Sequence, residues 1–206
     1  METPVLNLYQ PLDPKTDIRL LIVEKGSGTD PIRCRLVWAS FGRKPFYEAL
    51  SYAWGDPSGK RIIRIENHEL EIRTNLWHAL HTFRTKRRSR ILWVDALCIN
   101  QRNVKERNHH VGLMKQIYTN AAEVLVWLGV ASEDSHLAMR YLKMLLEPRV
   151  AWIPIDKESS TALKALCNRD YWQRMWILQE VSLAKSLTVY CGEDRVDWRA
   201  FVNLYS

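Results

Sequence analysis

The chain has 206 residues, of which 47% are hydrophobic, and carries nine tryptophans and a net charge of +7. This length suits a single domain over residues 1–206, and the apolar content is enough for a sizeable core, which excludes a disordered chain. No apolar run is long enough to span a bilayer, and the N-terminus has no basic stretch followed by an apolar one. We therefore expect a soluble cytoplasmic protein that does not enter a membrane.

The cysteines, histidines and basic residues point to no metal and no nucleic acid. The four cysteines are scattered without a CxxC pair or a Cys/His cluster, and the histidines form no HExxH pattern, so we expect reduced thiols and no metal centre. Much of the positive charge lies in residues 84–90, without interleaved aromatic side chains, and we interpret it as a solvated helix end. The sequence also lacks GxGxxG, GxxxxGK[ST] and GxSxG, which excludes the common phosphate-loop, dinucleotide-fingerprint and serine-hydrolase sites.

The first half of the chain is rich in predicted strands. Apolar, β-branched runs at 18–23 and 33–39 flank a loop containing glycine and proline, so residues 1–46 read as a β-rich lead-in with a hairpin. An apolar run at 47–55 stops at a Gly-Asp-Pro-Ser-Gly turn and predicts a core strand. A second hairpin is predicted from 61–65 and 69–72, before a helix that Thr74 or Asn75 can cap.

The second half alternates strands and helices. The pattern predicts buried strands at 91–94, 123–129 and 187–190, a helix from about 107 to 121, and a helix over 171–184. Between them lies a helical insertion at about 131–168, whose first helix is capped at Ser132, and a further helix begins within 193–206. We predict an α/β fold with a mainly parallel sheet, helices on both faces and N-terminal β-hairpin additions.

Polar side chains follow two of the predicted strands, at 47–55 and 91–94. Open α/β sheets bind ligands beyond the carboxyl ends of their parallel strands, so the polar and aromatic residues there are candidate site residues. Each has a structural alternative, because a strand-end carboxylate such as Asp95 can equally cap the next turn, and the others can be core, turn or loop residues. The candidates for substrate binding are Ser51, Tyr52, Trp54, Gly55, Asp95, Cys98, Asn100, Gln101, Arg107 and Trp176.

Glu180 is the residue with the most unusual predicted environment. If 171–184 is helical, the residues three and four positions away on either side are all apolar, so the carboxylate emerges from a core-facing stripe. A buried carboxylate either pairs with a cation or has a raised pKa that suits acid/base chemistry. From the residues alone, a structural ion pair with Arg107 or Arg174 is favoured over a catalytic role.

Several blocks of the sequence resemble the signature of the fungal heterokaryon incompatibility (HET) domain. The resemblance covers about residues 47–192 and implies a cytoplasmic effector domain of fungal self/non-self recognition. Such a domain leads to programmed cell death when an upstream recognition partner, for example of the NLR type, activates it. The matching blocks are YEALSYAWG at 47–55, LWVDALCINQ at 92–101, ER at 106–107, VLVWLG at 124–129 and YWQRMWILQE at 171–180.

HET domains are also similar, remotely, to TIR domains, which have a flavodoxin-like fold. The essential glutamate of NAD⁺-cleaving TIR domains lies in a Trp-Cys-x-x-Glu pattern, and Trp176 and Glu180 have that spacing, with Ile177 in place of the cysteine. The resemblance implies that Glu180 is catalytic, that NAD⁺ is a substrate and not a cofactor, and that oligomerisation precedes cleavage. The alternative is a non-enzymatic module that signals by homotypic assembly, so the sequence leaves open whether the chain is an enzyme.

Overall fold

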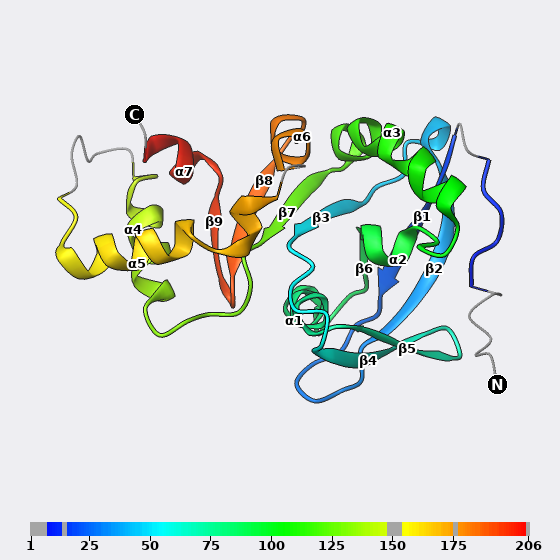
Figure 1. Ribbon diagram of the computed structural model, residues 1–206, viewed down its shortest axis with the longest axis horizontal. Coiled ribbons are helices and arrows are strands. Elements are labelled where there is room, and N and C mark those ends of the chain that lie inside the picture. The colour runs from blue at the N-terminus through cyan, green and yellow to red at the C-terminus, as the bar shows by residue number, and fades with distance from the viewer. Residues whose placement is uncertain (1–7, 14–15, 148–153, 175–176, 205–206) are drawn as a thin grey trace.

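The fold is built on one mixed β-sheet (Figure 1). The computed structural model describes residues 8–13, 16–147, 154–174 and 177–204. Within these residues nine strands lie in the order β5-β4-β2-β1-β6-β3-β7-β8-β9. The strands are β1 (Asp17–Val23), β2 (Arg33–Ser40), β3 (Glu48–Tyr52), β4 (Lys60–Ile65), β5 (His68–Arg73), β6 (Arg90–Trp93), β7 (Glu123–Trp127), β8 (Leu187–Cys191) and β9 (Asp194–Asp197).

The helices follow the strands in the order that the sequence suggests, with α4 and α5 inside the predicted insertion. Figure 1 places α4, α5 and α7 together at one end of the molecule, beyond β9. The α-helices are α1 (Thr74–Phe83), α2 (Asp95–Cys98), α3 (Val104–Asn120), α4 (Ser135–Met144), α5 (Lys157–Cys167), α6 (Ile177–Ser182) and α7 (Arg199–Asn203). Two short 3-10 helices, η2 (Phe41–Arg43) and η3 (Asp170–Gln173), complete the described elements.

The prediction of a mainly parallel sheet is wrong. Strands β6, β3, β7 and β8 do pair in parallel, but β1 pairs antiparallel with both β2 and β6. The β4–β5 and β8–β9 ladders are antiparallel as well, while β2 and β4 share only a short parallel ladder. The alternation of elements reveals their order along the chain but not their partners in space. The lead-in hairpin is therefore part of the sheet. Its strand β1 lies between β2 and β6 and pairs antiparallel with both, next to the parallel strands.

Helices cover both faces of the parallel strands, as predicted. Phe83 of α1 packs edge-on against Trp127 at a centroid distance of 5.8 Å, and Tyr118 of α3 packs edge-on against Trp93 at 5.8 Å. The pairing register places Trp127 beside Tyr52 and Trp93 beside Ala49. Because side chains alternate along a strand, Trp127 and Trp93 lie on opposite faces. Helices α1 and α3 thus enclose the sheet from two sides.

Both predicted hairpins are confirmed, but the predicted helix caps at Thr74, Asn75 and Ser132 are wrong. Helix α1 begins after Arg73 and α4 after Asp134, and neither N-cap side chain forms a capping hydrogen bond. Asn75 has another role: its Nδ2 donates to the Ala53 carbonyl oxygen at 2.7 Å, and its Oδ1 accepts from Trp127 Nε1 at 2.9 Å. This amide ties the loop after β3 to both α1 and β7.

The basic segment 84–90 is only partly the solvated helix end that the sequence suggests. Arg84 is buried and donates to the carbonyl oxygens of Gly28, Asp30 and Pro31. Arg90 forms a bidentate ion pair with Glu48 at the start of β3. These two arginines therefore stabilise the loop before β2 and the β6–β3 pairing, and only the residues between them carry freely solvated charge.

The C-terminal segment contains a strand that the sequence pattern missed. Residues 194–197 form β9, antiparallel to β8, before the short helix α7 begins.

Among the described residues no helix is both long and apolar enough to cross a bilayer. In that same part of the chain no group of three or more His, Cys, Asp or Glu side chains is placed to hold a metal ion.

Gly55 provides a test of the turn after β3. Its φ is +71°, and a Cβ atom there would lie 2.9 Å from the Asn75 Cβ. Gly55→Ala should lower the free energy of unfolding by about 1–2 kcal/mol from the left-handed backbone alone. Gly112, on an exposed part of α3 where an added Cβ would meet no neighbouring atom within 4 Å, is the matched control. Gly112→Ala should stabilise by about 0.5–1 kcal/mol, and urea unfolding in which Gly55→Ala is as stable as the parent would contradict the turn.

Candidate functional site

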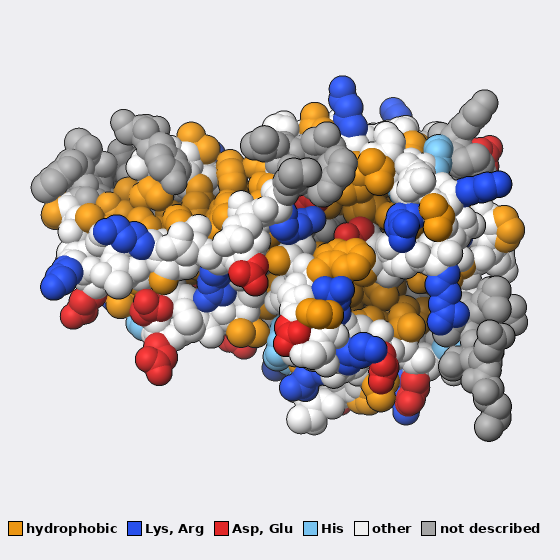
Figure 2. All heavy atoms as spheres, in the orientation of Figure 1, with side chains coloured by type: hydrophobic (Ala, Val, Ile, Leu, Met, Phe, Trp, Pro, Cys, Tyr) orange, Lys and Arg blue, Asp and Glu red, His pale blue; other side chains and the backbone are white. Residues whose placement is uncertain are grey.

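A cavity of about 350 Å³ lies beyond the carboxyl ends of β3 and β6. Because these strands are parallel neighbours, the segments that follow them leave the sheet on the same side, where open α/β sheets bind ligands. Figure 2 shows the molecule hollowed between α3 and the β4–β5 hairpin, and residues of β5 line a second, neighbouring cavity there. The cavity, named here the Glu180 cavity, is lined by Trp54, Asp95, Ile99, Gln101, Arg107, Val111, Met114, Arg174 and Glu180.

The Glu180 carboxylate is held by a cation and a hydroxyl. The side chain is 1% exposed, and Arg174 donates to its two oxygens, from Nη1 to Oε2 at 3.0 Å and from Nη2 to Oε1 at 2.9 Å. Ser51 Oγ donates a short hydrogen bond to Oε2. Since a hydroxyl has one proton to donate, Tyr171 OH must donate to Ser51 Oγ, at 2.8 Å. The charge is thus fixed by a network that starts on β3, η3 and α6.

Arg174 reaches Glu180 because the predicted helix over 171–184 is interrupted. That prediction is wrong: η3 ends at Gln173, Arg174 is extended with φ −79° and ψ 130°, and α6 begins at Ile177. In a continuous helix residues six positions apart do not face each other. Burial lowers the pKa of the Arg174 guanidinium, but the charge and hydrogen bonds of Glu180 outweigh it and leave the pKa above its ordinary value. Arg174 therefore stays charged at the cavity.

Asp95 forms the second acidic group of the Glu180 cavity. It begins α2, whose N-cap is Val94, so Asp95 is not the helix cap considered for it. Its Oδ1 accepts from the adjacent Ala96 backbone N–H at 2.7 Å. Its Oδ2 accepts from Trp54 Nε1 at 3.0 Å. Burial raises the pKa of the Asp95 carboxyl, and the bonds from Trp54 and Ala96 oppose that shift. Asp95 therefore lines the cavity while its carboxylate is held by Trp54 and the first turn of α2.

Trp54 and Gln101 border the Glu180 cavity from the loops after β3 and α2. The Arg73 guanidinium lies over the Trp54 ring at 5.0 Å from its centroid, and Gln101 Nε2 donates to the Asp95 carbonyl oxygen at 2.8 Å. Arg107 enters the cavity lining from α3, and among the described residues no carboxylate pairs with it. The alternative partners considered for Glu180 are thereby resolved in favour of Arg174.

Other predicted site residues lie behind or beside the cavity. Cys98 is buried, its Sγ accepts from the Val94 N–H at 3.3 Å, and burial raises the pKa of its thiol to about 12, so it is a structural residue. Gly55 serves the turn described above. Tyr52 and Asn100 line a neighbouring cavity, and burial raises the pKa of the Tyr52 phenol. Trp176 lies outside the described residues.

A buried ion pair holds the loop that carries Asp95 and Gln101. Arg19 of β1 bonds Glu106 of α3 at 2.5 Å and donates to the Cys98 carbonyl oxygen at 3.2 Å. Glu106 Oε1 in turn accepts from the Asn100 backbone N–H at 2.8 Å. The pair therefore connects the lead-in strand, the end of α2 and the start of α3, and it positions the cavity wall without lining the cavity.

Sequence reasoning missed Tyr171 and the apolar wall formed by Ile99, Val111 and Met114. Tyr171 belonged to the expected helix, where nothing distinguished it from other core aromatics. Val111 and Met114 belong to the apolar stripe of α3, which normally indicates core packing. No sequence signal separates an apolar residue that fills a core from one that lines a cavity.

The geometry leaves the Glu180 carboxylate able to accept a further hydrogen bond. A carboxylate has about four lone-pair sites, and two bonds from Arg174 and one from Ser51 occupy three of them. Glu180 lines the cavity, so the remaining acceptor site suits a ligand hydroxyl. The two carboxylates of the lining are balanced by Arg107 and Arg174, and the apolar wall beside them suits a flat ring.

The Arg174–Glu180 pair predicts strongly coupled stabilities. Glu180→Gln leaves Arg174 without its charge partner and should cost about 3–5 kcal/mol, nearer the lower value because the Arg174 side chain keeps 20% exposure. Arg174→Gln strands the more deeply buried carboxylate and should cost at least as much. The double variant removes both charges, so urea unfolding should show a loss smaller than the sum of the single losses by about 0.5–3 kcal/mol. If the loss of stability in the double variant equals the sum of the two single losses, Arg174 and Glu180 do not interact in solution.

Comparison with known proteins identifies the family. The profile described as heterokaryon incompatibility protein (HET) matches residues 47–180, which is more than half of the chain. The match includes every residue that lines the Glu180 cavity. The chain is 28% identical over 229 aligned residues to heterokaryon incompatibility protein 6, OR allele, of Neurospora crassa, covering 87% of this chain and 34% of that protein. No solved structure matches, so the likeness to TIR domains stays a prediction. The signature blocks and the profile together show that this chain belongs to the heterokaryon incompatibility (HET) family.

Proposed function

We propose that the chain cleaves NAD⁺ to nicotinamide and ADP-ribose at the Glu180 cavity, after the protein assembles. The observation that carries the proposal is a buried carboxylate, fixed by Arg174 and Ser51, that lines a cavity at the carboxyl edge of the sheet. Its spacing from Trp176 matches the glutamate pattern of NAD⁺-cleaving TIR domains. Buried carboxylates with a specific charge partner in such cavities are typical of active sites.

The proposed reaction is hydrolysis of the bond between the nicotinamide nitrogen and the ribose C1′. The electron pair of that bond goes to nicotinamide, water adds to C1′, and the released proton goes to solvent. Positive charge develops on the ribose as the bond breaks, and a preorganised carboxylate in a dry site stabilises it. The free acceptor site of Glu180 would hold a ribose hydroxyl, while the indole of Trp54 and the Asp95 carboxylate would face the cationic nicotinamide ring.

We place this activity in heterokaryon incompatibility, as the cytoplasmic cell-death effector of fungal non-self recognition. The support is the family and the name of the N. crassa relative. The chain spans 34% of the length of that relative. Oligomerisation on activation and the recognition partner are part of the proposal.

The second candidate function is a non-enzymatic module that signals by homotypic assembly. Two exposed aromatic side chains favour it, since Phe46 is 73% exposed and Trp38 is 53% exposed, and aromatic residues are common anchors of interfaces. The two functions are compatible, because assembly is the step that precedes cleavage in the main proposal.

Purified protein, artificially clustered through a fused oligomeric scaffold, should release nicotinamide from NAD⁺, as measured by chromatography over hours. Glu180→Gln should abolish release, and Glu180→Asp, which keeps the charge but shortens the side chain, should lower it at least about a hundredfold, corresponding to ~2.7 kcal/mol of transition-state stabilisation. Glu133→Gln, on an exposed acidic residue that lines neither this cavity nor the neighbouring one, is the matched control and should be fully active.

Thermal melts of each variant give its transition temperature, and the NAD⁺ assay is run below that temperature. This separates loss of chemistry from loss of folding. The proposal would be sunk by unchanged NAD⁺ in fully assembled parent protein. A folded Glu180→Gln variant with parental activity would remove Glu180 from the reaction.

A further inference from the structure

We propose that the adenosine half of the dinucleotide binds a second cavity, separated from the Glu180 cavity by Trp54 and Gln101. This inference rests on the proposed function. The second cavity, named here the Tyr9 cavity, has a volume of about 320 Å³. Each cavity alone is at the small end of the range of about 300–1,000 Å³ for small-molecule sites. A dinucleotide has two nucleoside halves, and two adjoining cavities of similar size match that division.

Strand β3 explains why the two cavities adjoin. Successive side chains on a strand point to opposite faces, so Ser51 turns toward Glu180 and α6 while Tyr52 turns toward α1. Tyr52 lines the Tyr9 cavity, and Trp54 and Gln101 line both. A ligand that passes over the Trp54–Gln101 wall therefore reaches both faces of the sheet edge.

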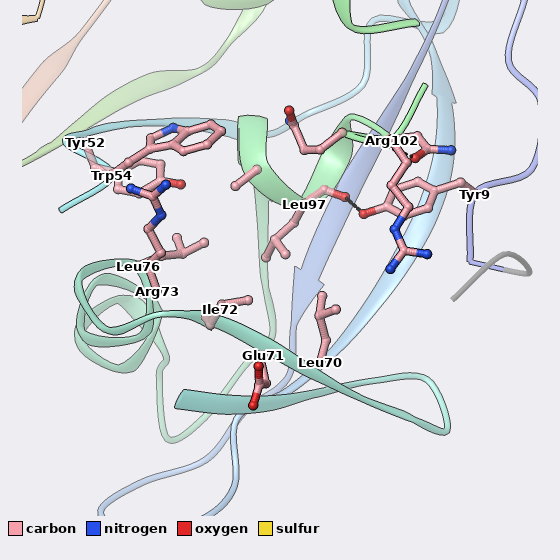
Figure 3. Close-up of a pocket in the computed structure, with 13 residues that line it drawn as sticks. Tyr9, Tyr52, Trp54, Leu70, Glu71, Ile72, Arg73, Leu76, Leu97 and Arg102 are labelled. Atoms are coloured by element: carbon pink, nitrogen blue, oxygen red, sulfur yellow. Dashed lines mark hydrogen bonds between the residues drawn. The ribbon is translucent and has the colours of Figure 1, made fainter. Parts of the chain in front are cut away.

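The Tyr9 cavity has the lining that a nucleobase requires. Figure 3 shows Tyr52 and Trp54 on one side of it and Tyr9 on the other, with Leu70 and Ile72 of β5 between them. Tyr9 OH donates to the Leu97 carbonyl oxygen at 3.2 Å, which fixes the far wall to α2. Flat aromatic and aliphatic side chains of this kind stack on a base without reading its sequence-specific edge.

Charge gives the ligand its direction. Arg73 and Arg102 line the Tyr9 cavity, and the acidic residue in its lining, Glu71, is paired with Lys60 at 3.3 Å. This end therefore favours the anionic phosphates that accompany adenosine. The Glu180 cavity is formally neutral, because Arg107 and Arg174 balance Asp95 and Glu180. Within it, the Asp95 carboxylate beside Trp54 is the group that attracts the cationic nicotinamide ring. The reverse orientation would place the phosphates beside Asp95 and remove the scissile bond from Glu180.

The test compares NAD⁺ with nicotinamide mononucleotide, which has the scissile bond but lacks the adenosine half. Arg102→Ala removes an exposed cation from the Tyr9 cavity, and Leu70→Trp fills it. Each should lower the preference for NAD⁺ over nicotinamide mononucleotide, as a ratio of kcat/KM, about tenfold. Arg140→Ala, an exposed arginine on α4 at the other end of the molecule, should leave the ratio unchanged (Figure 1).

Binding of AMP, measured by calorimetry on the same proteins, tests the cavity without turnover. We expect AMP to bind the parent and Arg140→Ala, and to bind Arg102→Ala and Leu70→Trp about tenfold more weakly. The inference is overturned if the parent does not bind AMP, or if both cavity variants keep parental AMP affinity and parental substrate preference. AMP binding that the cavity variants weaken, in a parent that cleaves neither nucleotide, would uphold the adenosine site and reject the cleavage reaction.

Discussion

The buried charge of Glu180 is the constraint on which the site depends. A carboxylate that is 1% exposed needs a cation and hydrogen bonds, because an isolated charge in a protein interior costs several kcal/mol. Arg174 supplies the cation, and Ser51 and Tyr171 supply the hydroxyls. This requirement accounts for the extended backbone at Arg174, which a regular helix would not allow. It also ties α6 to the end of β3, so that the position of the carboxylate follows from the sheet itself.

The carboxyl ends of the parallel strands place this carboxylate in one of two adjoining cavities. Parallel pairing of β3 with β6 brings the Ser51–Trp54 segment and the Asp95–Gln101 segment to one edge, and strand alternation sends neighbouring side chains to opposite faces. The Arg19–Glu106 pair anchors the second of these segments to β1 and α3. The antiparallel strand β1 therefore supports the site, although it contributes no residue to the Glu180 cavity. The lead-in hairpin is in this sense part of the functional unit.

The sequence predicted the components of the fold better than their arrangement. Apolar runs and turn residues identified both hairpins and the parallel strands, because those signals are local. The antiparallel pairing of β1 and the strand β9 were missed, since pairing partners are set by packing across the chain. For the site, the apolar setting of Glu180 predicted a compensated buried carboxylate, and Arg174 was one of two partners considered. The pattern could not choose between them, because a helix assumed to be continuous hides the break that brings Arg174 into place. Cys98 looked like its polar neighbours in sequence, yet it packs into the core, and only the fold distinguishes the two environments.

The central claim is that chemistry at Glu180, and not assembly alone, causes the death of the cell. The most direct test is a time course of NAD⁺ content and viability in the same fungal cells, expressing either the parent or Glu180→Gln at matched levels of assembled protein. We expect NAD⁺ to fall before viability in cells with the parent, and cells with the variant to keep both. Death with undiminished NAD⁺, or equal killing by the assembled variant, would contradict the claim.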